Sequence, residues 1–172
     1  MPIYRSFDRV YESWPLPVVN CDRVCARAFL AFGILLTHEH GDHVRGLDVF
    51  LRKCPVPILA SIMTGRVVQE GLREPVEWIV FESGQKFSWK GFDFTTFPLP
   101  HDAVEPVGYV ITRGKYSVGV ATDLGHVDKQ VTLALKGVQG LVLEANYEWK
   151  MLSVIKEQNY SLKYNIFIIK TY

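Results

Sequence analysis

Apolar residues in the first half of the chain are grouped in short runs that predict strands alternating with helices. Residues 32–36 and residues 58–60 are continuous apolar runs, each short enough for a buried strand. Between them, residues 44–53 carry apolar positions at helical spacing and end in two basic residues, which suit the C-terminal end of a helix. Ser61 is expected to cap a second helix that runs to about residue 72. The pattern therefore predicts a mixed α/β fold.

Strand-like runs separated by glycine-containing turns dominate the second half of the chain. Three of these runs, residues 77–81, 85–89 and 92–97, predict a meander that belongs to a second sheet. The remaining predicted elements are a hairpin of residues 107–112 and 116–122, a helix of residues 128–135 and a strand of residues 141–143.

The two ends of the chain have weaker patterns. Residues 14–17 contain two prolines and predict a loop, and residues 22–32 are compatible with a short helix. The apolar residues 166–172 predict either a terminal strand or an altered end that is exposed to aggregation. The first residues have no apolar core of the kind that a secretory signal needs.

The composition fits one globular domain without a strong charge. The chain of 172 residues has no repeat, and 19 basic residues against 18 acidic ones leave a formal charge of +1. Any attraction for phosphate must therefore be local, because no global basic field indicates nucleic acid or an anionic membrane as a partner. The most apolar stretch, residues 26–36, is shorter than the about 20 residues that span a bilayer. Three cysteines, an odd number, argue against a disulfide framework, so we expect a cytoplasmic protein with no membrane contact.

A dense cluster of histidines and carboxylates directly follows the predicted strand of residues 32–36. Its members are His38, Glu39, His40, Asp42 and His43. Crowded imidazoles repel one another when they are protonated and gain little from packing, so a purely structural role does not explain the cluster. We interpret it as a metal site in which Glu39 is a supporting or surface residue.

The spacing of the cluster excludes a helical zinc motif. The fourth residue after His38 is Asp42 rather than a second histidine, and Gly41 is expected to interrupt any helix. His38 and His40 lie two residues apart on extended backbone, so their side chains can point the same way. A turn at Gly41 would then let Asp42 and His43 serve a second ion.

Two later residues are further candidates for this site. His101 follows the predicted strand of residues 92–97, and three imidazoles are a common ligand set for one zinc ion. Asp123 ends a buried apolar strand, where a carboxylate is costly unless it is paired or binds metal, so it is a candidate to bridge two ions. His126 comes one turn later and is more often an exposed loop residue or a substrate contact.

Four motifs together make the chain resemble one family. They are His-x-His-x-Asp-His at residues 38–43, Pro-His-Asp-Ala-x-Glu-Pro at 100–106, Ala-Thr-Asp-Leu-Gly at 121–125 and Leu-Glu-Ala-Asn at 143–146. The first motif, placed after an apolar strand, resembles that of the metallo-β-lactamase superfamily of hydrolases. The combination resembles the WalJ/YycJ-type branch of bacterial hydrolases over residues 33–152. The resemblance implies a single domain of residues 1–172, of the α/β (α+β) class, with an αββα sandwich and two metal ions at one edge of the sheets.

The resemblance also implies a ligand set for each ion. His38, His40 and His101 would hold one ion, and Asp42, His43 and the bridging Asp123 would hold the other, with Asp42 and Asp123 as the expected catalytic carboxylates. Further contacts to the substrate or to the ligands are expected from Asp102, His126, Glu144 and Asn146. Zinc suits imidazole ligands best, and manganese is compatible with the carboxylates.

The activity that the resemblance implies is metal-dependent hydrolysis of phosphodiesters by a hydroxide between the two ions. A DNA exonuclease is the preferred interpretation, with DNA as the partner. Two other hydrolases of the same fold remain alternatives, a glyoxalase II-like thioesterase and a tRNA-maturing, RNA-processing nuclease.

Two departures from the family pattern add a third alternative, a catalytically impaired remnant. The Gly/Ser-rich turn that relatives carry near their N-terminus has no counterpart in residues 1–31, and no histidine follows His126. We therefore expect an incomplete sandwich and a second metal site with one ligand fewer. A homo-oligomer would complete that site only if a histidine of one subunit, such as His126, reached the site of the other.

Overall fold

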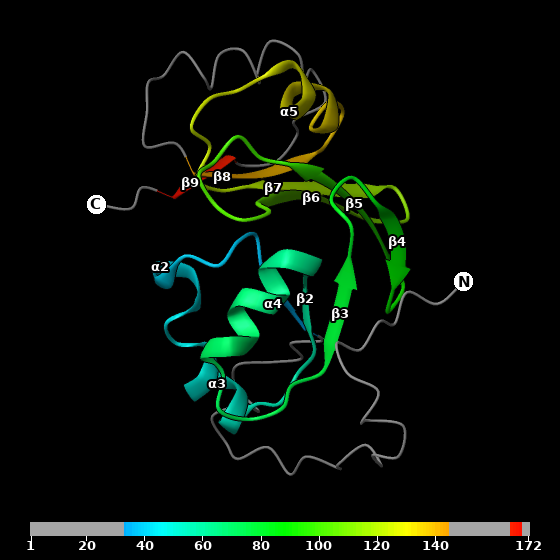
Figure 1. The fold of residues 1–172 in the computed structure, drawn as a ribbon. Helices are drawn as coiled ribbons and strands as arrows, with labels where there is room; N and C mark the ends of the chain where they lie inside the picture. Colours follow the sequence, from blue (N-terminus) through cyan, green and yellow to red (C-terminus); the bar gives the residue numbers. More distant parts are fainter. Residues whose placement is uncertain (1–32, 145–165, 170–172) are drawn as a thin grey trace. The chain divides into compact units, whose positions relative to one another are not determined.

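Two compact units, Met1–Glu82 and Ser83–Tyr172, make up the chain. The computed structural model describes residues 33–144 and 166–169 (Figure 1). The predicted loop of residues 14–17 and the predicted helix of residues 22–32 lie outside this part of the chain. Each unit contains its own sheet and its own apolar core, and the mixed α/β class predicted from the sequence is confirmed.

The first unit contains a three-stranded parallel sheet in the order β1-β2-β3. Its strands are β1 (Ile34–Leu35), β2 (Ile58–Ser61) and β3 (Trp78–Phe81). Helices α2 (Gly41–Val44) and α3 (Leu47–Lys53) connect β1 to β2, and α4 (Ile62–Gly71) connects β2 to β3. Parallel neighbours need such crossover connections, and all residues of β2 and β3 are buried, as is typical of a parallel sheet.

The core of the first unit forms where the apolar faces of the helices meet the sheet. The indole nitrogen of Trp78 donates a hydrogen bond of 2.7 Å to the side-chain oxygen of Gln69, which ties β3 to α4. The buried members of this core are Leu36, Leu47, Leu51, Ile58, Ala60, Val68, Trp78 and Val80. The segment that carries the histidine cluster therefore starts from a packed core.

Three predictions for the first unit need correction. The strand around Trp78–Phe81 joins β2 in the parallel sheet and does not open the meander, since α4 returns the chain alongside β2. The single helix predicted for residues 44–53 is divided by Arg45 and Gly46, because Gly46 takes the N-cap position of α3. Ser61 precedes α4 as predicted, but its side chain makes no capping hydrogen bond.

The second unit contains a six-stranded sheet in the order β4-β5-β6-β7-β8-β9. The strands are β4 (Lys86–Trp89), β5 (Phe92–Pro98), β6 (Val107–Arg113), β7 (Tyr116–Ala121), β8 (Gly140–Glu144) and β9 (Ile166–Ile169). Neighbouring strands from β4 to β7 are antiparallel, whereas β8 pairs in parallel with both β7 and β9. The predicted hairpin and the terminal-strand alternative for the apolar tail are confirmed.

Helix α5 (Lys129–Ala134) packs against this sheet. Asp128 is its N-cap, because the Asp128 carboxylate accepts a hydrogen bond of 2.7 Å from the backbone N–H of Val131. Gly119 in β7 leaves the space that Leu135 fills, since a Cβ on Gly119 would lie 2.5 Å from a methyl carbon of Leu135. The buried residues of this core are Phe97, Leu99, Ala121, Leu124, Val131, Leu135, Leu141 and Leu143.

Two broader predictions concern the whole chain. In residues 33–144 and 166–169, no helix is both long and apolar enough to cross a bilayer. The sequence predicted a single domain for residues 1–172, and this stays a prediction. The structure divides the chain into the two compact units described above.

Candidate metal centre

The histidine cluster begins at the carboxyl end of β1. The backbone N–H of Leu36 donates a hydrogen bond of 2.9 Å to the carbonyl of Leu59, so the segment stays attached to β2 beyond the end of β1. Leu36, Thr37 and His38 are all buried, and the side chain of His38 is only 1% exposed. The cluster was predicted to follow the carboxyl end of a strand, which is where open α/β sheets bind ligands.

His38, His40 and His43 lie close together within the first unit. The ring centroids of His38 and His40 are 4.6 Å apart, and those of His38 and His43 are 4.2 Å apart. His40 occupies the N-cap position of α2, and its carbonyl accepts a hydrogen bond of 2.9 Å from the backbone N–H of His43. The first turn of α2 therefore brings His43 back toward the two histidines that precede it.

The backbone of the cluster differs from the prediction at Gly41. This glycine is the first residue of α2 and is not among the residues with positive φ, so no left-handed turn occurs there. The extended backbone of His40, with φ of −59° and ψ of 145°, directs the chain into the helix. Gly41 therefore does not interrupt a helix but begins one.

Thr37 orients the imidazole of His38. Its hydroxyl oxygen lies 3.0 Å from Nδ1 of His38, and both side chains are buried. When Nδ1 carries the proton and donates it to this hydroxyl, the lone pair of Nε2 is available to a metal ion. Sequence analysis did not identify this role of Thr37, although its place directly before the first histidine was a signal.

Asp42 lies on the exposed side of α2. Its side chain is 68% exposed, and one carboxylate oxygen is 3.6 Å from Nε2 of His43. A carboxylate in the first turn of a helix is favoured by the helix dipole. In this arrangement Asp42 contacts a histidine of the cluster.

In the second unit, the loops that carry His101 and Asp123 are joined to each other. They follow β5 and β7, the two strands that flank β6. The backbone N–H of Gly125 donates a hydrogen bond of 3.1 Å to the carbonyl of Pro100. A Cβ on Gly125 would lie 2.9 Å from that carbonyl oxygen, so the close approach requires glycine. Sequence analysis did not identify this contact.

Asp123 has an unusual backbone conformation. Its φ is 55°, in the left-handed region that aspartate tolerates better than most residues but that still costs roughly 1 kcal/mol. Such strain is often found at functional sites.

Tyr109 on β6 is fully buried, and burial raises the pKa of its phenol, so it is a neutral side chain and not an anionic ligand.

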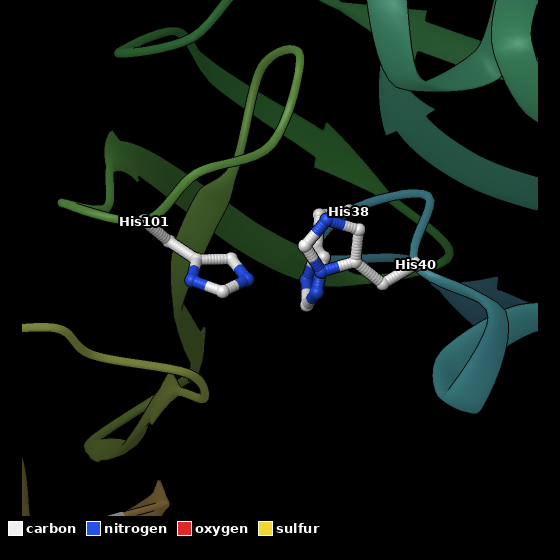
Figure 2. A group of neighbouring side chains, drawn as sticks. All are labelled: His38, His40 and His101. Carbon is white, nitrogen blue, oxygen red and sulfur yellow. The ribbon is translucent and has the colours of Figure 1, made fainter.

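The described residues offer two candidate ligand sets. One is His38, His40 and His101, and the other is His38, His43 and Asp123. Figure 2 shows the imidazoles of the first set, with His38 and His40 on the segment between β1 and α2 and His101 on the segment after β5. Imidazole nitrogens with one carboxylate are donors that zinc accepts, so the chemistry of these residues fits a divalent metal ion.

Comparison with known proteins agrees with this donor chemistry. Residues 30–159 match the model of the β-lactamase superfamily domain. The chain belongs to the metallo-β-lactamase superfamily. This confirms the family that the four motifs indicated, and the fold of this superfamily implies that the chain binds divalent metal.

Two curated relatives and one solved structure illustrate the relationship. The chain is 31% identical over 122 residues to the exodeoxyribonuclease YycJ of Bacillus anthracis, covering 70% of this chain and 46% of that protein. It is 29% identical over 123 residues to the exodeoxyribonuclease WalJ of Streptococcus pneumoniae strain D39, covering 69% and 46%. The chain therefore spans about half the length of these relatives. The metallo-β-lactamase fold protein YhfI of Bacillus subtilis superposes with a TM-score of 0.58 at 16% identity, covering 79% of this chain and 55% of YhfI, and confirms the fold.

The other residues predicted for this metallo-β-lactamase site differ in where they lie. Asp42 belongs to neither candidate ligand set, whereas its neighbour His43 belongs to one. Asp102 and His126 are exposed loop residues. Glu144 is the last residue of β8, and Asn146 lies outside the described residues. Their expected contacts with substrate stay predictions.

Proposed function

We propose that this chain hydrolyses phosphodiester bonds of DNA in a metal-dependent reaction, as an exonuclease. The observation that carries the proposal is the crowding of three imidazoles after β1, where the ring of His38 lies within 4.6 Å of one neighbouring ring and 4.2 Å of the other. The similarity to exodeoxyribonucleases over 70% of the chain supports DNA as the substrate. Because the chain spans only about half of those relatives, the activity is a proposal for this chain.

The proposed ligands form two sets. His38, His40 and His101 would hold one ion, and His43 and Asp123 would hold a second ion with help from Asp42. Zinc is the preferred metal because the ligands are mostly imidazoles, and manganese is the alternative. When bound, two such ions lower the pKa of a coordinated water and offset the charge that develops on the phosphoryl oxygens.

The residues of the chain would bind and orient the reacting groups. The hydroxyl of Thr37, 3.0 Å from Nδ1 of His38, would orient the ring so that Nε2 faces the metal ion. The hydrogen bond between Gly125 and Pro100 keeps the loops of His101 and Asp123 together. With two dications bound, the carboxylates of Asp42 and Asp123 would leave a local positive charge that attracts an anionic substrate, although the chain as a whole carries only +1.

The proposal is tested with the purified chain and labelled DNA. With zinc or manganese added, we expect stepwise shortening of end-labelled DNA and hydrolysis of bis(p-nitrophenyl) phosphate. Both should be lost in His101→Ala and Asp123→Asn, because each substitution removes a proposed ligand. Elemental analysis should show two metal ions per folded parent chain. In the control variant His38→Ala, both ions should be lost together.

Three results would contradict the proposal. Preferential cleavage of RNA would favour the RNA-processing alternative, and hydrolysis of a glutathione thioester without phosphodiesterase activity would favour the thioesterase. Fewer than two metal ions with no turnover would favour the impaired remnant.

A further inference from the structure

We propose that the second unit binds single-stranded nucleic acid at the end of its sheet opposite His101 and Asp123. The binding surface is a row of neighbouring aromatic and cationic side chains, which we call the basic–aromatic row. Its members are Trp89, Lys90, Phe92, Arg113, Lys115 and Tyr116. The biological role of this surface rests on the proposed function, but the binding itself can be tested separately.

The register of the strands places these residues side by side. Trp89 at the end of β4 pairs with Phe92 at the start of β5, and Arg113 at the end of β6 pairs with Tyr116 at the start of β7. Phe92 is joined to Arg113 across the β5–β6 pair, where the guanidinium carbon lies 5.1 Å from the ring centroid. The row therefore crosses four neighbouring strands without interruption.

Each cation of the row lies over an aromatic ring. Nζ of Lys90 is 5.7 Å from the ring of Trp89, and Nζ of Lys115 is 5.4 Å from the ring of Tyr116. The three cations are exposed, and Tyr116 is 56% exposed. The carboxylate of Asp93, an exposed acid at this end of the sheet, accepts a hydrogen bond from the hydroxyl of Ser88. Three positive charges and this one negative charge thus leave a local excess of positive charge on a chain whose formal charge is only +1.

Single-stranded nucleic acid is the partner that uses both properties of the row. Cations bind the phosphates, and aromatic rings stack with bases, each stacked base contributing enough for a loss of about fivefold or more when the ring is removed. An acidic protein would use the charges but would gain little from a row of rings. A duplex would use the phosphate contacts, but its bases are already stacked on each other.

The conformation of Lys90 supports a functional reason for this residue. Lys90 and Gly91 form the two-residue turn between β4 and β5, and both have positive φ, 52° and 79°. Such turns favour Asn-Gly, whereas a lysine in the left-handed region is strained. The turn alone therefore does not explain a lysine at this position.

The row lies far enough from the proposed ligands to set a minimum substrate length. Strand β6 runs from Val107, near the loop of His101, to Arg113 in the row. Seven residues of strand cover roughly 20 Å. At the 3.4 Å rise of a stacked strand, roughly six nucleotides are needed to reach from one end of the sheet to the other. Longer strands should therefore bind more tightly than very short ones.

The test measures binding of a labelled phosphorothioate oligodeoxythymidine of about 12 nucleotides to the full chain by fluorescence anisotropy. The triple variant Lys90→Gln/Arg113→Gln/Lys115→Gln should bind more weakly, with a salt slope reduced by about 2. The matched control Arg66→Gln/Arg73→Gln/Lys129→Gln removes three exposed charges elsewhere and should bind like the parent. Tyr116→Ala should weaken binding about fivefold or more, and Tyr116→Phe should restore it.

Two further comparisons separate stacking from charge and binding from folding. An abasic oligonucleotide of equal length should bind the parent more weakly than the oligodeoxythymidine does. Its affinity should be the same for Tyr116→Ala as for the parent, because it has no bases to stack on the ring. Lys90→Asn should raise the melting temperature by a few degrees, since asparagine suits the turn, and should still weaken binding.

The proposal is overturned if the triple variant and its control bind alike, or if polyglutamate competes as well as the oligonucleotide does. Hydrolysis of bis(p-nitrophenyl) phosphate distinguishes this failure from that of the proposed function. If that small substrate is cleaved while the row variants bind the oligonucleotide normally, the proposed binding surface is contradicted and the proposed function is kept. If no phosphodiester is cleaved but the row variants lose binding, the proposed function is contradicted and the proposed binding surface is kept.

Discussion

The contact between Thr37 and His38 is the smallest feature on which the proposed site depends. The hydroxyl of Thr37 lies 3.0 Å from Nδ1 of a histidine that belongs to both candidate ligand sets. Partners of this kind orient the ring and choose which nitrogen carries the proton. A change at Thr37 should therefore affect both proposed ions through one ring.

We expect Thr37→Val to lower metal affinity about 10- to 100-fold, because valine keeps the shape of threonine but has no hydroxyl. Competition with a chromophoric chelator measures this loss, and circular dichroism checks the fold. Thr37→Ser keeps a hydroxyl at the same position and should retain most of the affinity. Equal affinity of the valine variant and the parent would show that His38 needs no such partner.

The sequence predicts which residues carry metal chemistry but not how they are supported. His38 and His40 could be placed after a strand because an apolar run directly precedes them. The hydrogen bond of Thr37 and the left-handed φ of Asp123 depend on side-chain rotamers and backbone angles that spacing does not determine. The same is true of Gly41, where a helix start replaces the expected turn.

At the scale of the elements, two loops of the second unit are held together by one glycine. Gly125 follows β7, and its N–H reaches the carbonyl of Pro100 after β5. Any side chain at residue 125 would meet a backbone oxygen, which cannot rotate away as a side chain could. The relative placement of His101 and Asp123 therefore depends on this contact.

We expect Gly125→Ala to lower metal affinity by about tenfold or more, since the added Cβ separates the loops that carry the two ligands. Gly140→Ala is the matched control, because its Cβ would meet its nearest atom at 3.4 Å, an ordinary contact distance. Isothermal titration with zinc compares the two variants. A loss of similar size in both would mean that the glycine substitutions act through general stability.

Most elements could be predicted from periodicity, but not the sheet to which each belongs. The run Trp78–Phe81 was recognised as part of a strand, yet its partner is β2 and not β4. Its four consecutive apolar residues are typical of a buried parallel strand, and this was the signal in the sequence. The run of residues 85–89 was predicted as a strand, and β4 (Lys86–Trp89) confirms it.

At the scale of the whole molecule, the motifs that indicate the family lie in both compact units. His38, His40 and His43 belong to the first unit, and His101 and Asp123 belong to the second. Family membership could be predicted from four motifs because they are spread over both units. The division of the chain at Glu82 could not, since no change of composition marks it.

We expect zinc to slow amide hydrogen exchange in the segments that carry the proposed ligands, because a bound ion stabilises the loops that hold it. Mass spectrometry should show added protection in residues 36–43 and in residues 99–106. His101→Ala removes a ligand of the second unit only, yet it should also reduce the protection of residues 36–43. Unchanged protection there would mean that the first unit binds its metal without the second.

The long connection between the last two strands of the second sheet has a consequence for the synthesis of the protein. Strand β8 pairs with β9, whose residues are made later, and the parallel pairing closes only when Ile166–Ile169 have emerged. At about 5–20 residues per second, the 22 positions from Glu144 to Ile166 take roughly 1–4 s to translate. During that interval the unpaired backbone groups along the edge of β8 are open to other nascent chains. The protein should therefore depend on chaperones at the ribosome more strongly than a fold whose neighbouring strands are all joined by short turns.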